Sequence, residues 1–172
     1  PSHEYELFLG NIKRQLSESY LALHTGMAEY DEALGGIYGI NILGGSPKAG
    51  KSCFGIQLAT EIARKKMGVL YYDFENGTQK IYQRTLSRLS RVAVDKIVSA
   101  ELNDEEKSRL DGAQTELQNM LEFFRVVNDR QINPVIMRRH VDFLRHETRK
   151  DDTLVVLDSL HKLPFKDLDE CR

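Results

Sequence analysis

The sequence predicts an α/β protein built around a mainly parallel sheet. Stretches with helical periodicity alternate with short, apolar, β-rich runs, which is typical of parallel sheets whose strands are connected by helices. The chain has 172 residues, 41% of them hydrophobic, which is enough for one domain with a buried core. No internal repeat, low-complexity tract or interdomain linker interrupts the pattern.

The first elements lead to a glycine-rich motif. Residues 4–20 are predicted to form a helix because apolar side chains recur at helical spacing, although Gly10 interrupts the pattern. Residues 25–39 are rich in glycine and predict a loop. Residues 40–43, Ile-Asn-Ile-Leu, predict a short buried strand that ends at two glycines. The apolar residues of the first helix are Tyr5, Phe8, Ile12 and Leu16.

A second helix and a second strand follow the motif. Apolar residues at helical spacing after Ser52 predict a helix whose last turn carries Lys65 and Lys66, with Gly68 just past its end. Residues 69–74, Val-Leu-Tyr-Tyr-Asp-Phe, predict the next strand. The apolar stripe of the helix consists of Phe54, Leu58 and Ile62.

The remaining elements are predicted from caps and periodicity. Thr78 is a plausible cap for a helix, and Asn103 followed by Glu106 indicates a capping box for a helix over about 104–121. Asn133-Pro134 predicts the start of a further helix with Ile136, His140 and Leu144 facing inward. The strands predicted around these helices are residues 123–127 and 153–158.

Composition narrows the class of protein. The 24 basic and 26 acidic residues leave a net charge of −2, so any contact with nucleic acid must come from a local loop or from assembly. No apolar run is long enough to span a membrane, and residues 1–4 lack a signal-peptide layout, so we expect a soluble cytoplasmic protein. Cys53 and Cys171 have no metal-site spacing and are expected to be reduced thiols.

A phosphate-binding loop is the most specific motif in the sequence. Residues 45–52 match the pattern G-x-x-x-x-G-K-[ST], between a predicted strand and a predicted helix. Lys51 would meet the β- and γ-phosphates of a nucleoside triphosphate, and the Ser52 hydroxyl would coordinate Mg²⁺. The alternative is a glycine-rich turn that matches by chance. The predicted nucleotide-binding residues of this segment are Gly45, Ser46, Pro47, Lys48, Ala49, Gly50, Lys51, Ser52 and Cys53.

Two acidic residues at strand ends are candidates for metal binding and for catalysis. Asp158 ends a buried strand, where it can hold the Mg²⁺ shell through water, although such a residue can also be an ordinary turn residue. Glu75 follows the strand after the phosphate-binding loop, where it can orient and deprotonate the attacking water. The alternative is that Asp73 or Glu75 is a solvated charge at the strand end.

The residues around the motif carry a family resemblance. A Thr-Gly pair and an Asp-x-x-Leu-Gly-Gly stretch precede the first predicted strand, as at the entry to RecA-superfamily cores. Within that superfamily the chain most resembles the C-terminal domain of DnaB-type replicative helicases, including phage primase-helicase relatives. The matching residues are Thr25-Gly26, Asp31 to Gly36, Gly39, Glu75, Arg84 within Gln83 to Leu86, and 155–163, which is similar to the Walker B strand.

The resemblance implies a three-layer sandwich with a RecA-like sheet and a site for ATP and Mg²⁺. It implies Glu75 as the catalytic base, Lys51 as a catalytic cation, and Arg84 and Tyr82 as contacts to the nucleotide. Tyr82 can equally be a core residue, and Arg84 a surface charge. The resemblance also implies single-stranded DNA as a partner, a hexameric ring and a role in DNA replication. Two alternatives share the same residues: a regulatory ATPase without nucleic acid and a non-hydrolysing nucleotide-binding scaffold.

The resemblance extends over about residues 23–168. We therefore expect residues 1–22 to form an N-terminal helix or linker and residues 23–172 to form the nucleotide-binding core. Because the chain ends at Arg172, we expect a core truncated after the Walker B strand, without the sensor, DNA-contacting loops and arginine finger of the family.

Overall fold

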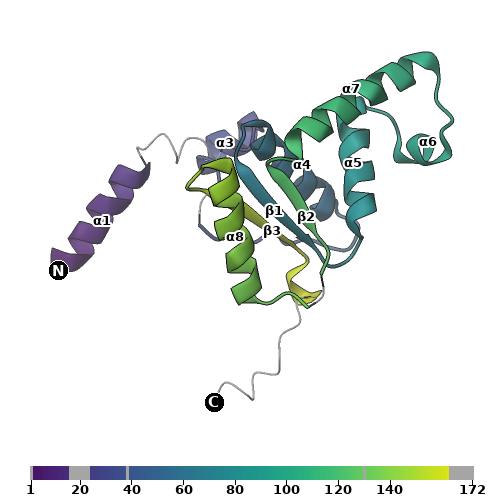
Figure 1. Ribbon diagram of the computed structural model, residues 1–172. Coiled ribbons are helices and arrows are strands. Elements are labelled where there is room, and N and C mark those ends of the chain that lie inside the picture. The colour runs from purple at the N-terminus through teal and green to yellow at the C-terminus, as the bar shows by residue number, and fades with distance from the viewer. Residues whose placement is uncertain (1, 16–23, 38, 130, 163–172) are drawn as a thin grey trace. The chain divides into compact units, whose positions relative to one another are not determined.

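The computed structural model describes residues 2–15, 24–37, 39–129 and 131–162 (Figure 1). The chain divides into two compact units, Pro1–Ser46 and Pro47–Arg172, which are described separately. The predicted division into residues 1–22 and 23–172 stays a prediction.

The first unit contains two described helices. Helix α1 spans Ser2–Gln15, as the apolar spacing predicts, and the predicted continuation to residue 20 lies outside the described residues. Helix α3 spans Ala28–Leu34, where the glycine-rich sequence predicts a loop. The Asp31 carboxylate accepts hydrogen bonds from the backbone N–H of Thr25 at 2.7 Å and from that of Gly26 at 2.9 Å. These bonds hold the Thr-Gly turn against the helix.

The pKa of Asp31 reflects this turn. Burial raises the pKa of the carboxyl, but the hydrogen bonds from the backbone and hydroxyl of Thr25 and the backbone of Gly26 outweigh it and leave the pKa below its usual value. The Thr-Gly pair and the Asp-x-x-Leu-Gly-Gly stretch therefore form one local structure.

The prediction of a strand over residues 40–43 is wrong. These residues have no regular secondary structure, and the side chains of Ile40 and Ile42 are 96% and 87% exposed. A strand exists only through hydrogen bonds to a neighbouring strand, and the described residues of the first unit contain none. An apolar run alone therefore does not specify a strand here.

The second unit is organised around a three-stranded parallel sheet. Its strands are β1 (Gly68–Asp73), β2 (Phe124–Val127) and β3 (Thr153–Asp158), in the order β2-β1-β3. All six residues of β1 are buried, as expected for a central strand of a parallel sheet. The register of β1 and β3 pairs Asp73 with Asp158, so both strands end at the same level. The predictions of these three strands are confirmed.

The two faces of β1 contact different helices. Leu70, Tyr72 and Phe74 pack in a cluster with Leu144 of helix α8 (Pro134–Thr148). The alternate residue Tyr71 faces helix α4 (Lys51–Arg64), where its hydroxyl approaches Gly55. Successive side chains of a strand point to opposite faces, so α4 and α8 contact opposite faces of β1 (Figure 1).

Three further helices connect β1 to β2 in the sequence. They are α5 (Thr78–Ser90), α6 (Val94–Ser99) and α7 (Asp104–Met120). The predicted capping box of α7 is confirmed. The Asn103 side chain accepts a hydrogen bond from the Glu106 N–H at 2.8 Å, and the Glu106 side chain accepts one from the Asn103 N–H. The prediction of Thr78 as a cap is wrong, because Gly77 is the N-cap of α5 and Thr78 is its first residue. A short 3-10 helix, Leu160–Lys162, follows β3.

The end of α4 also differs from expectation. Lys66 adopts the left-handed backbone conformation after the helix, with φ of 58°, and Gly68 begins strand β1 instead. A side-chain carbon at Gly68 would lie 3.0 Å from Cδ2 of Leu144. Glycine at this position therefore permits the close approach of α8 to the sheet.

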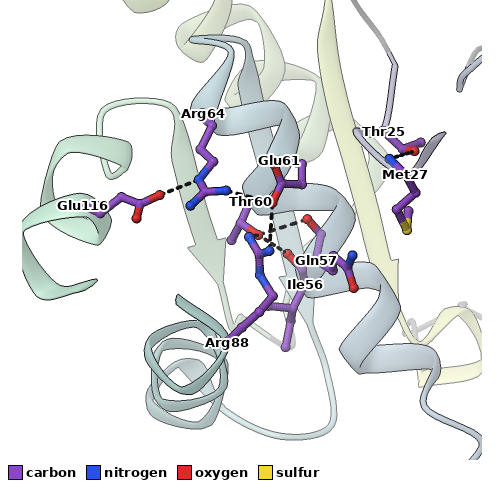
Figure 2. Close-up of polar contacts among 9 residues, drawn as sticks. All are labelled: Thr25, Met27, Ile56, Gln57, Thr60, Glu61, Arg64, Arg88 and Glu116. Carbon is purple, nitrogen blue, oxygen red and sulfur yellow. Dashed lines mark hydrogen bonds and ion pairs between the residues drawn. The ribbon is translucent and has the colours of Figure 1, made fainter. Parts of the chain in front are cut away.

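A network of ion pairs connects the outer helices to α4 (Figure 2). Arg88 of α5 donates to Thr60 at 2.5 Å and to Glu61 at 2.8 Å, both on α4. Arg64 of α4 bonds Glu61 at 3.0 Å and also Glu116 of α7. The side chains of this network fix α5 and α7 to the helix that follows the phosphate-binding motif.

Among the helices that the structure describes, none is long and apolar enough to cross a membrane.

Candidate functional site

The phosphate-binding motif is an exposed loop that runs into the start of α4. Gly45 and Ser46 belong to the first unit, and Pro47 to Ser52 belong to the second. Residues 45–50 are exposed, and the loop turns through left-handed backbone at Lys48 (φ 65°) and at Gly50 (φ 91°), the N-cap of α4. Glycine adopts this conformation without steric cost, which explains its position directly before the helix.

Lys51 and Ser52 are the first two residues of α4, and both are partly buried. The N–H groups of the first turn of a helix have no partner within the helix and carry its positive dipole end, so they attract anions. The helix predicted after the motif is confirmed, but the strand predicted before it is not. Cys53 is exposed and forms no disulfide within the described residues, and Cys171 lies outside them.

Strands β1 and β3 bring three acidic residues to one edge of the sheet. Asp73 and Asp158 are register partners at the last position of each strand, and the Phe74 N–H donates to the Asp158 carbonyl at 2.8 Å. Glu75 lies two residues beyond β1, and its side chain is exposed. The predicted strand-end positions of Glu75 and Asp158 are therefore on adjacent strands.

Asp73 is not the solvated charge that one alternative supposed. It is fully buried, and its carboxylate accepts bonds from the backbone N–H groups of Asn76 at 3.0 Å and of Gly77. The N–H of Glu75 approaches the same carboxylate at 3.4 Å. A buried carboxylate needs such donors, and here they fix the loop that carries Glu75. Spacing in the sequence gives no indication of this role.

A tyrosine links this edge of the sheet to the helix that follows the loop. The Tyr71 hydroxyl donates to Oδ2 of Asp158 at 2.8 Å. A side-chain carbon at Gly55 of α4 would lie 3.3 Å from that hydroxyl. Gly55 lies one helical turn after Ser52, so both residues are on the same side of α4. The start of α4 and the end of β3 are thus connected through Tyr71.

The electrostatics of Tyr71 agree with this position. Burial raises the pKa of the Tyr71 phenol, and the negative charge of Asp158 raises it further. Arg84 of α5 acts in the opposite direction on the same phenol, so its guanidinium lies within electrostatic range of the Tyr71–Asp158 pair. The phenol therefore stays protonated and remains a donor to the carboxylate.

The structure separates the two candidate contacts on α5. Tyr82 is partly buried; burial raises the pKa of its phenol, and the charge of Arg125 on β2 partly offsets this. Residues two positions apart on a helix do not face the same way. The charge of Arg84 acts on the Tyr71 phenol, whereas the charge of Arg125 acts on the Tyr82 phenol, so the two α5 positions have different electrostatic neighbours.

Ser52 in the first turn of α4 and Asp158 at the end of β3 were predicted to hold Mg²⁺. Within the described ranges, no group of three His, Cys, Asp or Glu residues could hold a metal ion by itself. Ser52 and Asp158 both offer oxygen atoms, which Mg²⁺ prefers, and Mg²⁺ commonly takes only one or two protein ligands together with phosphates and waters. The donor set therefore fits Mg²⁺ bound with a phosphate ligand.

Two comparisons with known proteins give matches to the same kind of domain. A sequence model of the DnaB-like helicase C terminal domain matches residues 22–170. The chain is also 29% identical over 111 residues to the replicative DNA helicase DnaB of Buchnera aphidicola subsp. Baizongia pistaciae (strain Bp). That alignment covers 61% of this chain and 24% of the helicase, so the chain spans a small part of its relative.

Proposed function

The chain belongs to the DnaB-like helicase C-terminal domain family, and from this premise we propose that it binds ATP with Mg²⁺ and hydrolyses it. The observation that carries the proposal is the phosphate-binding motif at the start of α4, which is connected through Tyr71 to the Asp158 carboxylate at the end of β3. Phosphoryl transfer needs a cradle for the phosphates, a divalent cation and an oriented water.

Each site residue has a defined task in this proposal. Lys51 and the N–H groups of the loop hold the phosphates. The Ser52 hydroxyl and, through water, the Asp158 carboxylate would hold Mg²⁺, which would neutralise charge on the phosphates. Glu75 accepts a proton from the attacking water, which its exposed position at the end of β1 permits. Arg84 and Tyr82 are proposed contacts to the base or phosphates of the nucleotide.

The wider proposal follows the family. The two helices on opposite faces of β1, both within Pro47–Arg172, support a three-layer, RecA-like sandwich. The proposed core comprises residues 23–172, and residues 1–22 are proposed as an N-terminal helix or linker. Hydrolysis would drive single-stranded DNA through a ring of six copies during replication. The net charge of −2 is consistent with DNA contacts that depend on assembly.

The proposal is tested first by substitution of Lys51 with alanine. We expect Lys51→Ala to remove most affinity for ATP–Mg²⁺, because a charge-assisted contact to the β- and γ-phosphates is lost. Isothermal titration calorimetry with a non-hydrolysable ATP analogue measures this, and Lys150→Ala, at an exposed lysine between α8 and β3, is the matched control. Unchanged affinity in Lys51→Ala would remove the basis of the nucleotide-site proposal.

Stimulation of ATP turnover by single-stranded DNA tests the proposed role in moving DNA. ATP turnover by a protein that contains this domain should rise when single-stranded DNA is added. Turnover that is indifferent to DNA would favour a regulatory ATPase, and nucleotide-dependent assembly without turnover would favour a scaffold.

A further inference from the structure

We infer that Tyr71 is a positioning residue for Asp158, and that Gly55 is required because it leaves room for the Tyr71 hydroxyl beside that carboxylate. The inference rests on the proposed function, in which Asp158 holds the water shell of Mg²⁺. It adds two residues to the site that the phosphate-binding motif and the strand-end carboxylates do not include.

The sheet directs Tyr71 toward Asp158. Tyr71 pairs with Val156 in the register of β1 and β3, and Asp158 follows Val156 by two residues. Residues two apart on a strand share a face, and a diagonal neighbour on the adjacent strand is within reach of an aromatic side chain. The phenol spans this diagonal, and its hydroxyl donates to Oδ2 of Asp158 at 2.8 Å.

The ring of Tyr71 has little freedom to move. The residue is fully buried, and its ring meets the Phe124 ring edge-on, with centroids 6.4 Å apart. The bond to Oδ2 fixes rotation of the carboxylate about its last single bond, and thereby the direction of the other oxygen. Partners that orient a metal-binding carboxylate in this way typically affect metal affinity by about 10- to 100-fold.

Gly55 explains how the hydroxyl fits beneath α4. A side-chain carbon at this position would lie 3.3 Å from the Tyr71 hydroxyl and 3.8 Å from Cγ1 of Val156. A contact of 3.3 Å is tight, so the hydroxyl would have to shift by a few tenths of an ångström. Glycine within a helix is unfavourable compared with alanine, and this close approach gives a reason for it.

The chain supplies a matched control on the other face of the same strand. Tyr72 is also fully buried, and its hydroxyl lies 3.2 Å from Nδ1 of His140 on α8. Tyr71→Phe and Tyr72→Phe therefore each remove one hydroxyl and one hydrogen bond from a buried tyrosine of β1. Only the first of these bonds involves Asp158.

The experiment measures the Mg²⁺ dependence of nucleotide binding in the full chain. A fluorescent, non-hydrolysable ATP analogue is titrated by anisotropy at increasing Mg²⁺ concentration and also without Mg²⁺. We expect Tyr71→Phe to raise the Mg²⁺ concentration for half-maximal binding by about 10-fold, while Tyr72→Phe stays near wild type. Binding without Mg²⁺ should be the same in all three proteins, because the phosphate contacts are intact.

Gly55→Ala provides an independent test that retains the tyrosine. We expect it to raise the Mg²⁺ requirement in the same direction as Tyr71→Phe, and the double variant to show no further increase, because both changes act on one hydrogen bond. Circular dichroism and thermal melting test whether the variants fold. A fully additive double variant would overturn the link between Gly55 and Tyr71.

Asp158→Asn distinguishes failure of this inference from failure of the proposed function. If Asp158→Asn raises the Mg²⁺ requirement and Tyr71→Phe behaves like Tyr72→Phe, the positioning role is overturned and the Mg²⁺ role of Asp158 stands. If Asp158→Asn leaves the Mg²⁺ dependence unchanged, the metal role itself is wrong, and the inference falls with it.

Discussion

Asp73 and Glu75 lie two residues apart at the end of β1 but have opposite surroundings. Asp73 is buried and accepts hydrogen bonds from the backbone of the following loop, whereas the Glu75 side chain is exposed. The first residue therefore shapes the loop, and the second faces solution, where a water molecule can reach it. Of these two side chains, the proposed role of general base therefore suits that of Glu75.

Replacement of Glu75 by glutamine tests the role of the carboxylate. Glu75→Gln keeps the shape of the side chain but removes the base, so we expect ATP to bind normally while hydrolysis falls by about 10²-fold or more. Phosphate release under single-turnover conditions measures the rate, and the exposed Glu101, between α6 and α7, gives a matched Glu101→Gln control. Wild-type turnover in Glu75→Gln would return Glu75 to an ordinary strand-end charge.

At the scale of elements, α7 depends on its capping box. The Asn103 side chain accepts from the Glu106 N–H at 2.8 Å, and the Glu106 side chain accepts from the Asn103 N–H at 3.1 Å. We expect Asn103→Ala to lower the free energy of unfolding by about 1 kcal/mol without changing ATP affinity. Urea denaturation measures this, and Asn103→Asp, which retains an acceptor oxygen, should remain close to wild type. Equal destabilisation by both variants would contradict the cap.

Elements with local determinants could be predicted from the sequence. Helices α7 and α8 carry capping residues, Asn103 and Asn133, whose side chains bond the backbone three residues later in the structure. Residues 40–43 have no comparable local determinant, because a strand depends on its partner. Short helix α6 was not predicted, and α3 lies where the glycines predicted a loop. Neither has a side-chain bond at its N-cap that a sequence pattern could indicate.

The residues of the candidate site also differ in whether a local sequence pattern predicts them. Lys51 and Ser52 follow from a contiguous motif, and the structure has them at the start of α4 as expected. The bond between Tyr71 and Asp158 joins residues 87 positions apart, and a tyrosine within an apolar run is indistinguishable in sequence from a core residue. Such contacts depend on the strand register, which the local sequence does not contain.

At the scale of the whole molecule, the proposed ring of six copies would complete each site with a residue from a neighbouring copy. An arginine supplied by a neighbour typically accelerates phosphoryl transfer by about 10³- to 10⁵-fold. We therefore expect this chain to bind ATP–Mg²⁺, to hydrolyse it barely above background and to be largely monomeric, whereas a longer protein that contains this domain should form rings and hydrolyse ATP. Turnover measured across concentrations, with mass from light scattering, tests this. Fast hydrolysis that is independent of concentration would favour a self-contained site.

The central position of β1 has a consequence for the chain as it is synthesised. Both strands that pair with β1 come later in the sequence, and β1 ends at Asp73 whereas β2 begins at Phe124. At about 5–20 residues per second, a ribosome needs roughly 3–10 s to cover that interval. Throughout it, an apolar strand has both edges unpaired, which is a condition that favours aggregation. Lys65 and Lys66 before the strand and Glu75 after it keep charge beside the nascent strand, whatever each residue does in the folded protein.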